Sequence, residues 1–444
     1  MSLLRAELTV ASLAPGGDGV AHLELGGERR AVFVPHAVPG DRLRAEIDPA
    51  RRPARGRVLA LLAPGPDRVA PACPYCTRCG GCDWMHLSLE AQARTHQEHL
   101  RAALPPPWRE LPIASHAAPE ALAYRTRTRL HVLCERGRVE VGMHEARTHD
   151  PVVVDACVVL APALERARRS LAPLFAGCRG KGEAQLALGA GGVPVLEVRW
   201  TGHLAPECFG RLERAVHAGE LAGARVALAE ASRPAVVGDP TPWMAGADGQ
   251  PLRLAPGGFG QASEAMNTLL ARHVAGLVRP WDVDRAVELY AGAGNLSVLL
   301  AGVTGELVLV ESSREACDAA RANLAARSAQ ARQARQARQT RKTRKTRVVE
   351  ADAASYVWGA TTKLVVLDPP RTGARPVCER LATSRVAHVV YVSCDAQTLG
   401  RDLALLAPAY RPTALATFEM FPQTSHVEAV VALERVRPGT RERR

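Results

Sequence analysis

The pattern of hydrophobic and polar positions divides the chain into three blocks. In residues 1–62, short runs that alternate between apolar and polar side chains, such as 31–35 and 41–47, are separated by turn-forming segments rich in glycine and proline. Alternation with a period of two is typical of strands that bury one face, and turns at this spacing join hairpins. The first block therefore predicts a small β-barrel.

The last block, residues 246–444, alternates between continuous apolar runs and segments with helical periodicity. Apolar runs lie within 285–295, 306–313, 363–371 and 388–395, and residues 314–327 have the spacing of an amphipathic helix. Strands buried on both faces give this pattern, because helices cover both sides of a parallel sheet. The block predicts an α/β fold with a doubly wound, Rossmann-like sheet.

The middle block, residues 63–245, begins with four closely spaced cysteines and contains a strand-like run at 123–133. Within that run Arg125, Arg127 and Arg129 alternate with Thr and Leu side chains. Because alternate residues of a strand point to the same side, the three guanidinium groups are expected on one face, which suits a phosphate backbone.

The composition of the chain indicates a polyanionic partner. The 444 residues carry 57 Lys and Arg against 45 Asp and Glu, a net charge of +12, which favours binding to nucleic acid or to an anionic membrane. No apolar run reaches the roughly 18 residues of a membrane-spanning helix, and the first residues lack the apolar core of a signal peptide. We therefore expect a cytoplasmic protein that does not span a membrane, and we also expect a monomer. Which polyanion it binds depends on the motifs described below.

Much of the positive charge lies in one low-complexity segment, residues 327–347. It contains nine basic and no acidic residues, so that the chain without it would carry a net charge of +3. Its three-residue repeat advances about 300° per step on a helix, which would spread the basic side chains around the axis. We expect a mobile insertion that adds nonspecific affinity for phosphate.

The cysteines indicate a metal site rather than disulfides. Eleven is an odd number, seven of the cysteines are scattered singly, and thiols in the cytosol are kept reduced. The other four, in the sequence CPYCTRCGGC at 73–82, follow one another in three-residue steps, as in ferredoxins, whereas structural zinc usually pairs two separated knuckles. An iron-sulfur cluster, a zinc ion and a group of unliganded thiols remain the alternatives.

The chemically distinctive residues of the last block follow its predicted strands. Gly292 and Gly294 follow the first apolar run, and Glu311 ends the second, where a carboxylate could accept hydrogen bonds from ribose hydroxyls. Asp368 and Cys394 end the next two runs. Since ligands bind at the carboxyl ends of the strands in open α/β sheets, we expect these side chains in one site.

These motifs, in this order, resemble the RNA uracil-C5 methyltransferase family. The resemblance rests on the glycine-rich loop and on DPPRTG at 368–373, VSCDAQTLGRDL at 392–403 and FPQTSHVE at 421–428. It covers nearly the whole chain, since GGDGVAHL and VFVPHAVPGD resemble the OB-like barrel called a TRAM domain and CPYCTRCGGC resembles the family's iron-sulfur segment. It implies three domains: an RNA-binding barrel (1–62), a central RNA-binding α+β domain with a [4Fe-4S] cluster (63–245), and an S-adenosylmethionine-dependent methyltransferase domain (246–444).

The reaction of that family explains why these residue types occur. Carbon 5 of uracil is a poor nucleophile until a thiolate adds to carbon 6, after which carbon 5 accepts the methyl group of S-adenosylmethionine. A base then removes the carbon-5 proton, so that the thiolate is expelled. The resemblance implies Cys394 as the nucleophile, Glu428 as the base, and Asp368 as a residue that positions uracil and cofactor. Without these motifs, the simplest interpretation of Cys394 would be a small buried hydrophobic residue, and that of Glu428 would be a partner in an ion pair.

The resemblance also implies a cofactor pocket and a set of cluster ligands. The cofactor pocket is expected to contain Gln261, Tyr290, Asn295, Glu311, Asp352 and Asp368. The expected ligands of the [4Fe-4S] cluster are Cys73, Cys79, Cys82 and Cys157, which leaves Cys76 as a spare thiol. From spacing alone, Cys76 is an equally acceptable ligand.

Two classes of function are consistent with these features. The first is an RNA uracil-C5 methyltransferase, whose target is 23S rRNA or, alternatively, a uridine of the tRNA T-loop. The iron-sulfur segment together with the TRAM-like barrel favours rRNA. The second is a catalytically inactive RNA-binding module, and the joint presence of Asp368, Cys394 and Glu428 favours the enzyme over it.

Overall fold

The computed structural model describes residues 3–25, 27–148, 150–336 and 345–436. Its contacts divide the chain into two compact units. The first unit contains Met1–His99, Met143–Val158 and Phe421–His426, and the second contains Leu100–Gly142, Val159–Met420 and Val427–Arg444. Within the described ranges, none of the helices combines the length and the hydrophobicity that crossing a membrane requires.

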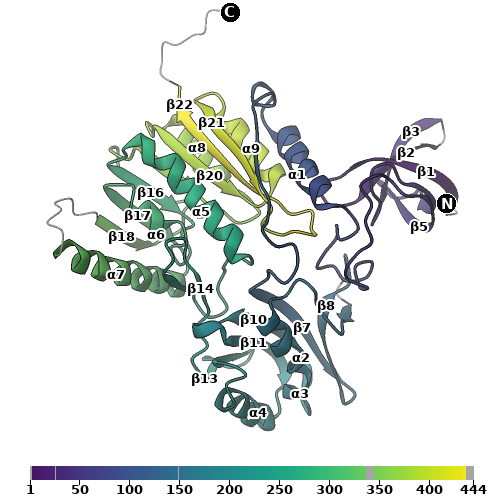
Figure 1. The fold of residues 1–444 in the computed structure, drawn as a ribbon, viewed down its shortest axis with the longest axis horizontal. Helices are drawn as coiled ribbons and strands as arrows, with labels where there is room; N and C mark the ends of the chain where they lie inside the picture. The colour runs from purple at the N-terminus through teal and green to yellow at the C-terminus, as the bar shows by residue number, and fades with distance from the viewer. Residues whose placement is uncertain (1–2, 26, 149, 337–344, 437–444) are drawn as a thin grey trace, which may run out of the picture. The chain divides into compact units, whose positions relative to one another are not determined.

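The first unit begins with a closed barrel. Its strands β1 (Leu4–Leu13), β2 (Gly19–Leu25), β3 (Glu28–Val34), β4 (Arg42–Asp48) and β5 (Ala54–Ala63) follow the order β1-β2-β3-β5-β4. Alternate residues of β4, namely Leu43, Ala45 and Ile47, are buried in the barrel core. The barrel predicted from the alternating N-terminal pattern is confirmed (Figure 1).

The cysteine run at 73–82 follows the barrel and is tied by hydrogen bonds to two later segments of the same unit. The amide of Gly80 donates to the carbonyl of His144 (2.9 Å), and the hydroxyl of Tyr75 donates to the carboxylate of Asp155 (2.6 Å). Strand β9 (Pro151–Val153) lies between these two anchor points in the sequence. Folding of this unit therefore brings Asp155, two residues before Cys157, next to the cysteine run.

The second unit contains a mixed sheet in which strands follow the order β13-β12-β11-β10-β7-β8. The strands are β7 (Arg127–Glu135), β8 (Arg138–His144), β10 (Arg179–Leu188), β11 (Pro194–His203), β12 (Gly223–Leu228) and β13 (Ala235–Gly238). Helices α2 (Pro162–Arg169), α3 (Leu171–Leu174) and α4 (Pro206–His217) accompany it. Neighbouring strands are antiparallel except for β11 and β12, which are parallel, so this part of the unit has an α+β arrangement.

The larger sheet of the second unit has the strand order β18-β17-β16-β19-β20-β22-β21-β6. Its strands are β6 (Ala114–His116), β16 (Arg285–Leu289), β17 (Glu306–Glu311), β18 (Lys345–Glu350), β19 (Leu364–Leu367), β20 (His388–Ser393), β21 (Tyr410–Phe418) and β22 (Glu428–Arg435). Strands β16 to β20 are parallel, and β22 is antiparallel to β20. The strand order reverses at β16, and such a reversal is where open α/β sheets bind ligands.

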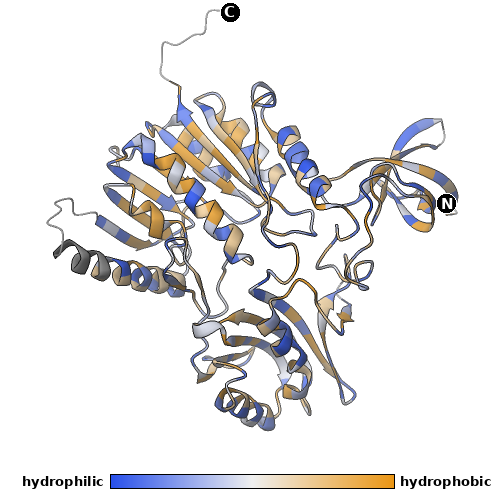
Figure 2. Cartoon of the chain, viewed as in Figure 1, coloured by the Kyte–Doolittle hydropathy of each residue, from blue (hydrophilic) through white to orange (hydrophobic). Residues whose placement is uncertain are grey.

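Helices cover both faces of this sheet (Figure 1). They are the end of α1 (Leu89–Ala103), α5 (Glu264–Val278), α6 (Ser297–Leu300), α7 (Arg314–Gln336), α8 (Arg375–Thr383) and α9 (Ala396–Leu406). Helices α8 and α9 pack on the face that presents Leu367 and Leu415, whereas His273 of α5 contacts Phe418 on the other face. Figure 2 shows the strands as largely hydrophobic, as expected for a sheet covered on both sides. The doubly wound sheet is confirmed.

Parts of the basic segment 327–347 have regular secondary structure. Helix α7 continues through it as far as Gln336, and Lys345–Arg347 form the beginning of β18. Arg327 forms a bidentate ion pair with Asp248, at 2.5 and 2.8 Å. Ala, Arg and Gln are strong helix formers whatever their pattern, which explains the helix; the mobility of the insertion stays a prediction. The rest of the segment, residues 337–344, lies outside the described residues.

Candidate active site

The chain turns sharply at the carboxyl end of β16. Tyr290, Gly292 and Gly294 have φ angles of 62°, 54° and 86°. Glycine adopts such angles freely, but a tyrosine does so only where its surroundings hold it, which is a common feature of functional sites. The amide of Ala291 donates to the carbonyl of Val310 (3.1 Å) and so fixes this turn against the end of β17.

Glu311, at the end of β17, connects the turn to the next loop. Its carboxylate accepts hydrogen bonds from the amides of Gly292 (2.9 Å) and Ser313 (2.8 Å). Glu311 is half-buried, and an ionised carboxylate has about four acceptor positions. The carboxylate therefore keeps the glycine-rich turn in place and retains acceptor capacity for hydroxyl groups of a ligand.

Asp352 and Tyr290 lie close to each other at this edge. The amide of Ala351 donates to the carbonyl of Glu311 (2.9 Å), which places the end of β18 beside the end of β17. Burial raises the pKa of Tyr290 to about 12, and the negative charge of Asp352 contributes to the increase. The structure thus brings together Tyr290, Glu311 and Asp352, three of the predicted cofactor residues.

Three amide side chains lie on or next to α5. Gln261 is 5% exposed, and its Oε1 has no hydrogen-bond partner among the described residues. Asn295 pairs with Asn267 of α5 through two reciprocal amide hydrogen bonds of 2.9 and 2.7 Å. Asn267 was not anticipated from the sequence, although it follows Gln261 by six residues, in the motif GFGQASEAMN. A buried acceptor without a partner, such as Gln261 Oε1, fits a donor group on a ligand.

Cys394 and Glu428 face each other at the junction of β20 and β22. Ser393 pairs with Ala429 in the antiparallel ladder, so the next facing positions are Cys394 and Glu428. Glu428 is 3% exposed, and its Oε2 has no hydrogen-bond partner among the described residues. Asp368 follows β19 directly. The structure therefore brings all three residues of the predicted mechanism to one edge of the sheet.

The surroundings at this edge raise the pKa values of all three groups. Burial, followed by the negative charges of Glu428 and Asp368, raises the pKa of the Cys394 thiol to about 12. Burial also raises the pKa of Asp368 to about 7 and holds the pKa of Glu428 well above its usual range. Arg371 opposes the shifts of Cys394 and Glu428, because a nearby positive charge favours the ionised forms. Sequence reasoning did not single out this arginine within DPPRTG.

A buried carboxylate holds the loop that carries Asp368 and Arg371. Asp402 of α9 is fully buried and accepts hydrogen bonds from the amide of Ala374 (2.6 Å) and the hydroxyl of Tyr391 (2.7 Å). Arg401 donates to the same carboxylate (2.9 Å) and to the carbonyl of Thr372 (2.8 Å). Asp402 also lies within the motif VSCDAQTLGRDL, but the sequence alone does not reveal its partners.

One arginine of the face predicted around residues 125–129, Arg127, has an internal role. Arg127 donates to the carbonyl of Gly258 (2.5 Å) in the loop before Gln261, and burial lowers the pKa of Arg127 to about 10. Arg129 forms an ion pair with Glu183 (3.8 Å). The alternation is as expected, but Arg127 positions the loop of the site instead of facing solvent.

The cysteine run meets only part of the requirement for a metal site. Cys73, Cys79, Cys82 and Cys157 are half-buried, while Cys76 is buried. Burial and the charge of Cys73 raise the pKa of Cys76, which disfavours the thiolate form that binds metals. Over the described ranges, no group of three His, Cys, Asp or Glu side chains is arranged to hold a metal ion. The structure thus brings the two segments together without assembling a ligand set.

Comparison with known proteins agrees with this site. Residues 252–436 match the family described as tRNA (Uracil-5-)-methyltransferase. The 23S rRNA (uracil(1939)-C(5))-methyltransferase RlmD of Chromohalobacter salexigens is 33% identical, over 98% of this chain and 90% of that protein. RlmD of Halomonas elongata is 34% identical, over 97% of this chain and 89% of that protein.

A solved structure shares the fold. The tRNA (uracil-54, C5)-methyltransferase of Pyrococcus abyssi, in complex with S-adenosyl-L-homocysteine, superposes with a TM-score of 0.71 at 20% identity and covers 97% of this chain and 100% of that one. Its identity supports the fold alone, whereas the relatives above extend over almost the full length of both proteins. The chain belongs to the RNA uracil-C5 methyltransferase family.

Proposed function

We propose that this protein methylates carbon 5 of a uridine in 23S rRNA, at the position that the names of its relatives number 1939. The observation that carries the proposal is the placement of Cys394 opposite Glu428 and beside Asp368 at the carboxyl edge of the sheet. A nucleophile, a base and a third carboxyl group meet where an open α/β sheet binds its ligands.

In the proposed mechanism, the thiol of Cys394 transfers its proton to water, and Sγ forms a bond to carbon 6 of the uracil. This addition makes carbon 5 nucleophilic, so that carbon 5 takes the methyl group. Glu428 then accepts the carbon-5 proton, and the bond between Sγ and carbon 6 breaks. Bound S-adenosylmethionine supplies the methyl group on a positively charged sulfonium.

The residues around the cofactor pocket suit this chemistry. Gln261, Tyr290, Asn295, Glu311, Asp352 and Asp368 surround the glycine-rich turn or lie on the loops beside it. Glu311 has acceptor capacity for ribose hydroxyls, and Gln261 Oε1 for a cationic or N–H donor. Arg371, through its effect on both pKa values, favours the ionised forms of Cys394 and Glu428 that the reaction needs.

The test uses two variants that fail at different steps. Cys394→Ala has no thiol to add to carbon 6, so it is expected to bind RNA but neither to methylate it nor to form a covalent adduct. Glu428→Gln retains the nucleophile but lacks the base, so a methylated protein–RNA adduct is expected to accumulate on denaturing gels only when S-adenosylmethionine is present. Near wild-type turnover by Glu428→Gln would show that Glu428 is not the base, and methylation by Cys394→Ala would refute the mechanism.

Mass mapping of 23S rRNA and tRNA from a deletion strain would identify the target.

The remaining domains are proposed to bind the RNA. Residues 1–62 would form the RNA-binding barrel, 63–245 the central RNA-binding domain and 246–444 the methyltransferase domain. Several arginines of the barrel already pair with acids, as Arg55 does with Asp18 (2.6 Å) and Arg57 with Glu46 (2.9 Å). Phosphate contacts by these two arginines would therefore compete with existing ion pairs.

We further propose that Cys73, Cys79, Cys82 and Cys157 hold a [4Fe-4S] cluster with a structural role. The resemblance of the cysteine run supports this set, as do the hydrogen bonds that tie the run to His144 and Asp155. Protein purified without oxygen is expected to contain about four irons per chain. The Cys157→Ala variant should lose the iron, and the Cys76→Ala variant should keep it. If Cys76→Ala instead lost the iron and Cys157→Ala kept it, residues 73–82 would supply all the ligands.

A further inference from the structure

A large cavity lies away from the strand ends, among the helices of the smaller sheet of the second unit. It has a volume of about 980 Å³ and is bounded by α2, α3 and α4 and by the turns at 191–194 and 218–221. None of the residues assigned above to catalysis, to the cofactor or to the metal lines it. This cavity is called the α2–α4 pocket below.

The α2–α4 pocket has an apolar floor and a basic rim. Leu171, Leu174 and Leu221 form part of the floor and are buried. The rim carries Arg166, Arg169, Arg211 and Arg214, against a single acidic lining residue, Glu220. Five ionisable side chains with a net charge of +3 therefore surround an apolar surface, a combination that suits a nucleotide better than an apolar ligand.

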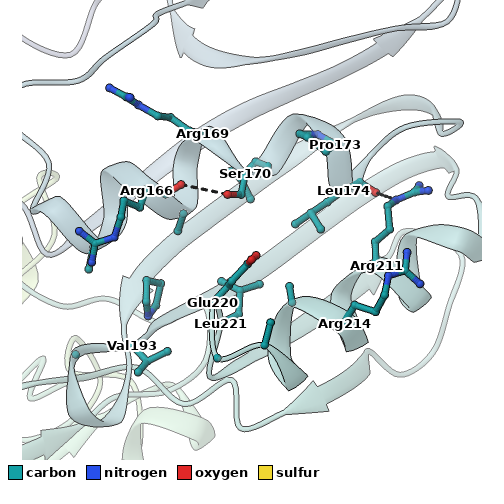
Figure 3. A pocket seen from close by; sticks show the side chains of 18 of the residues that line it. Arg166, Arg169, Ser170, Pro173, Leu174, Val193, Arg211, Arg214, Glu220 and Leu221 are labelled. Atoms are coloured by element: carbon teal, nitrogen blue, oxygen red, sulfur yellow. Dashed lines mark hydrogen bonds between the residues drawn. The ribbon is translucent and has the colours of Figure 1, made fainter.

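The four arginines are not equivalent. Arg211 donates to the carbonyls of Leu174 (2.9 Å) and Ala176, which fixes it against α3. Arg169 pairs with Glu165 (2.9 Å) and points away from the cavity (Figure 3). Among the described residues, Arg166 and Arg214 form no ion pair, and Figure 3 shows them at opposite ends of the cavity, with Glu220 between them. These two guanidinium groups are therefore the ones available for phosphate.

We propose that the α2–α4 pocket binds a single-stranded segment of the RNA substrate. Arg166 and Arg214 contact phosphates at the two ends of this segment, while a base or ribose lies in the apolar part of the cavity between them. Glu220 would repel a phosphate, so it faces a base edge that presents an N–H donor. The inference rests on the proposed function, since it assigns a second contact to the same RNA.

The test compares two double variants in which the same charge is removed. Arg166→Ala/Arg214→Ala alters the pocket, whereas Arg138→Ala/Arg321→Ala removes two arginines from other parts of the same unit, where they pair with Glu140 and Asp318. The measurement is binding to a 23S rRNA fragment as a function of salt concentration. Each lost phosphate contact lowers the salt slope by about 0.7 for single-stranded RNA. The pocket variant is therefore expected to lose about 1.4 from the slope, and roughly 25-fold in affinity at 0.1 M salt.

The methylation rate at saturating RNA is expected to stay at the wild-type value, because the strand-end residues are unchanged. Thermal unfolding of both double variants checks that the fold is retained. Equal slopes for the two variants, or an unchanged affinity of the pocket variant, would refute the inference while leaving the proposed function intact. Failure of the wild-type protein to methylate the fragment would instead count against the proposed function, whatever the slopes.

Discussion

Replacement of Asp402 by Asn tests whether the catalytic loop depends on a buried carboxylate. Asp402 Oδ2 accepts two hydrogen bonds, from the Ala374 amide and the Tyr391 hydroxyl. An asparagine fits the same space, but its NH2 group would face either these two donors or the guanidinium of Arg401. In both orientations at least one donor loses its acceptor, and the charge that strengthens every bond is lost.

The expected cost follows from the number and burial of these bonds. A hydrogen bond to a charged group contributes about 1.5–3 kcal/mol, and two of them end on the fully buried Oδ2. Arg401 is 42% exposed, so its ion pair with Asp402 adds little beyond this. We expect Asp402→Asn to lower the free energy of unfolding by about 3–5 kcal/mol, in the range of a broken buried pair.

The loop should also move, and with it Asp368 and Arg371. A displacement of about 1 Å near reacting groups costs on the order of 100-fold in rate, so kcat is expected to fall that far while binding of RNA is retained. The assays are urea unfolding and single-turnover methylation below the unfolding transition. Tyr391→Phe is the control, since it removes one hydroxyl and should cost about 1–1.5 kcal/mol with a smaller loss of rate. A destabilised Asp402→Asn with wild-type kcat would show that the loop position does not depend on Asp402.

Three further predictions use other parts of the structure. Burial raises the pKa of Glu288 to about 8. The contribution of Glu288 to the free energy of unfolding is therefore complete below its unfolded pKa of 4.5 and is lost as pH rises through 8. Glu288→Gln should reduce the pH dependence of the free energy of unfolding, measured by urea unfolding, by up to about 1.4 kcal/mol per pH unit. Arg371→Ala should raise the pKa of Cys394 further and slow its alkylation by iodoacetamide near neutral pH, and unchanged alkylation would argue against the influence of Arg371. Deletion of residues 337–344 removes four basic side chains, so it should weaken RNA binding and its salt dependence without changing which uridine is methylated.

The sequence predicted those parts of the fold that follow from local pattern. The apolar runs located β16, β17, β19 and β20, and the residue after each run marked the edge where the site lies. The alternating N-terminal block predicted the barrel for the same reason, since the period of a strand is visible in its own side chains. The motifs around Cys394 and Glu428 indicated the family, and the similarity to known relatives confirms that assignment.

Features that depend on pairing between distant segments could not be predicted in this way. Strand β6 lies at the sheet edge beside β21, some 300 residues later in the chain, and three residues give no usable period. From the sequence, Arg127 was indistinguishable from a solvent-facing charge. In the structure, its hydrogen bond to the carbonyl of Gly258 ties it to the loop before Gln261. The helical part of the repeat in α7 could not be recognised from its hydrophobic pattern. Uniform Arg, Ala and Gln have high helix propensity, but they give no apolar stripe along the helix.

The surroundings of Cys394 disfavour its thiolate form. A free thiolate at this edge would be open to oxidation, whereas burial and the neighbouring carboxyl groups hold its pKa at about 12. Burial also raises the pKa values of Glu428 and Asp368. The negative charge formed when one of these groups ionises opposes ionisation of the other two, whereas a positive charge beside the site favours ionisation of the group that it contacts. Arg371 supplies part of that charge, so the loop anchored by Asp402 links the fold of α9 to the protonation of the nucleophile.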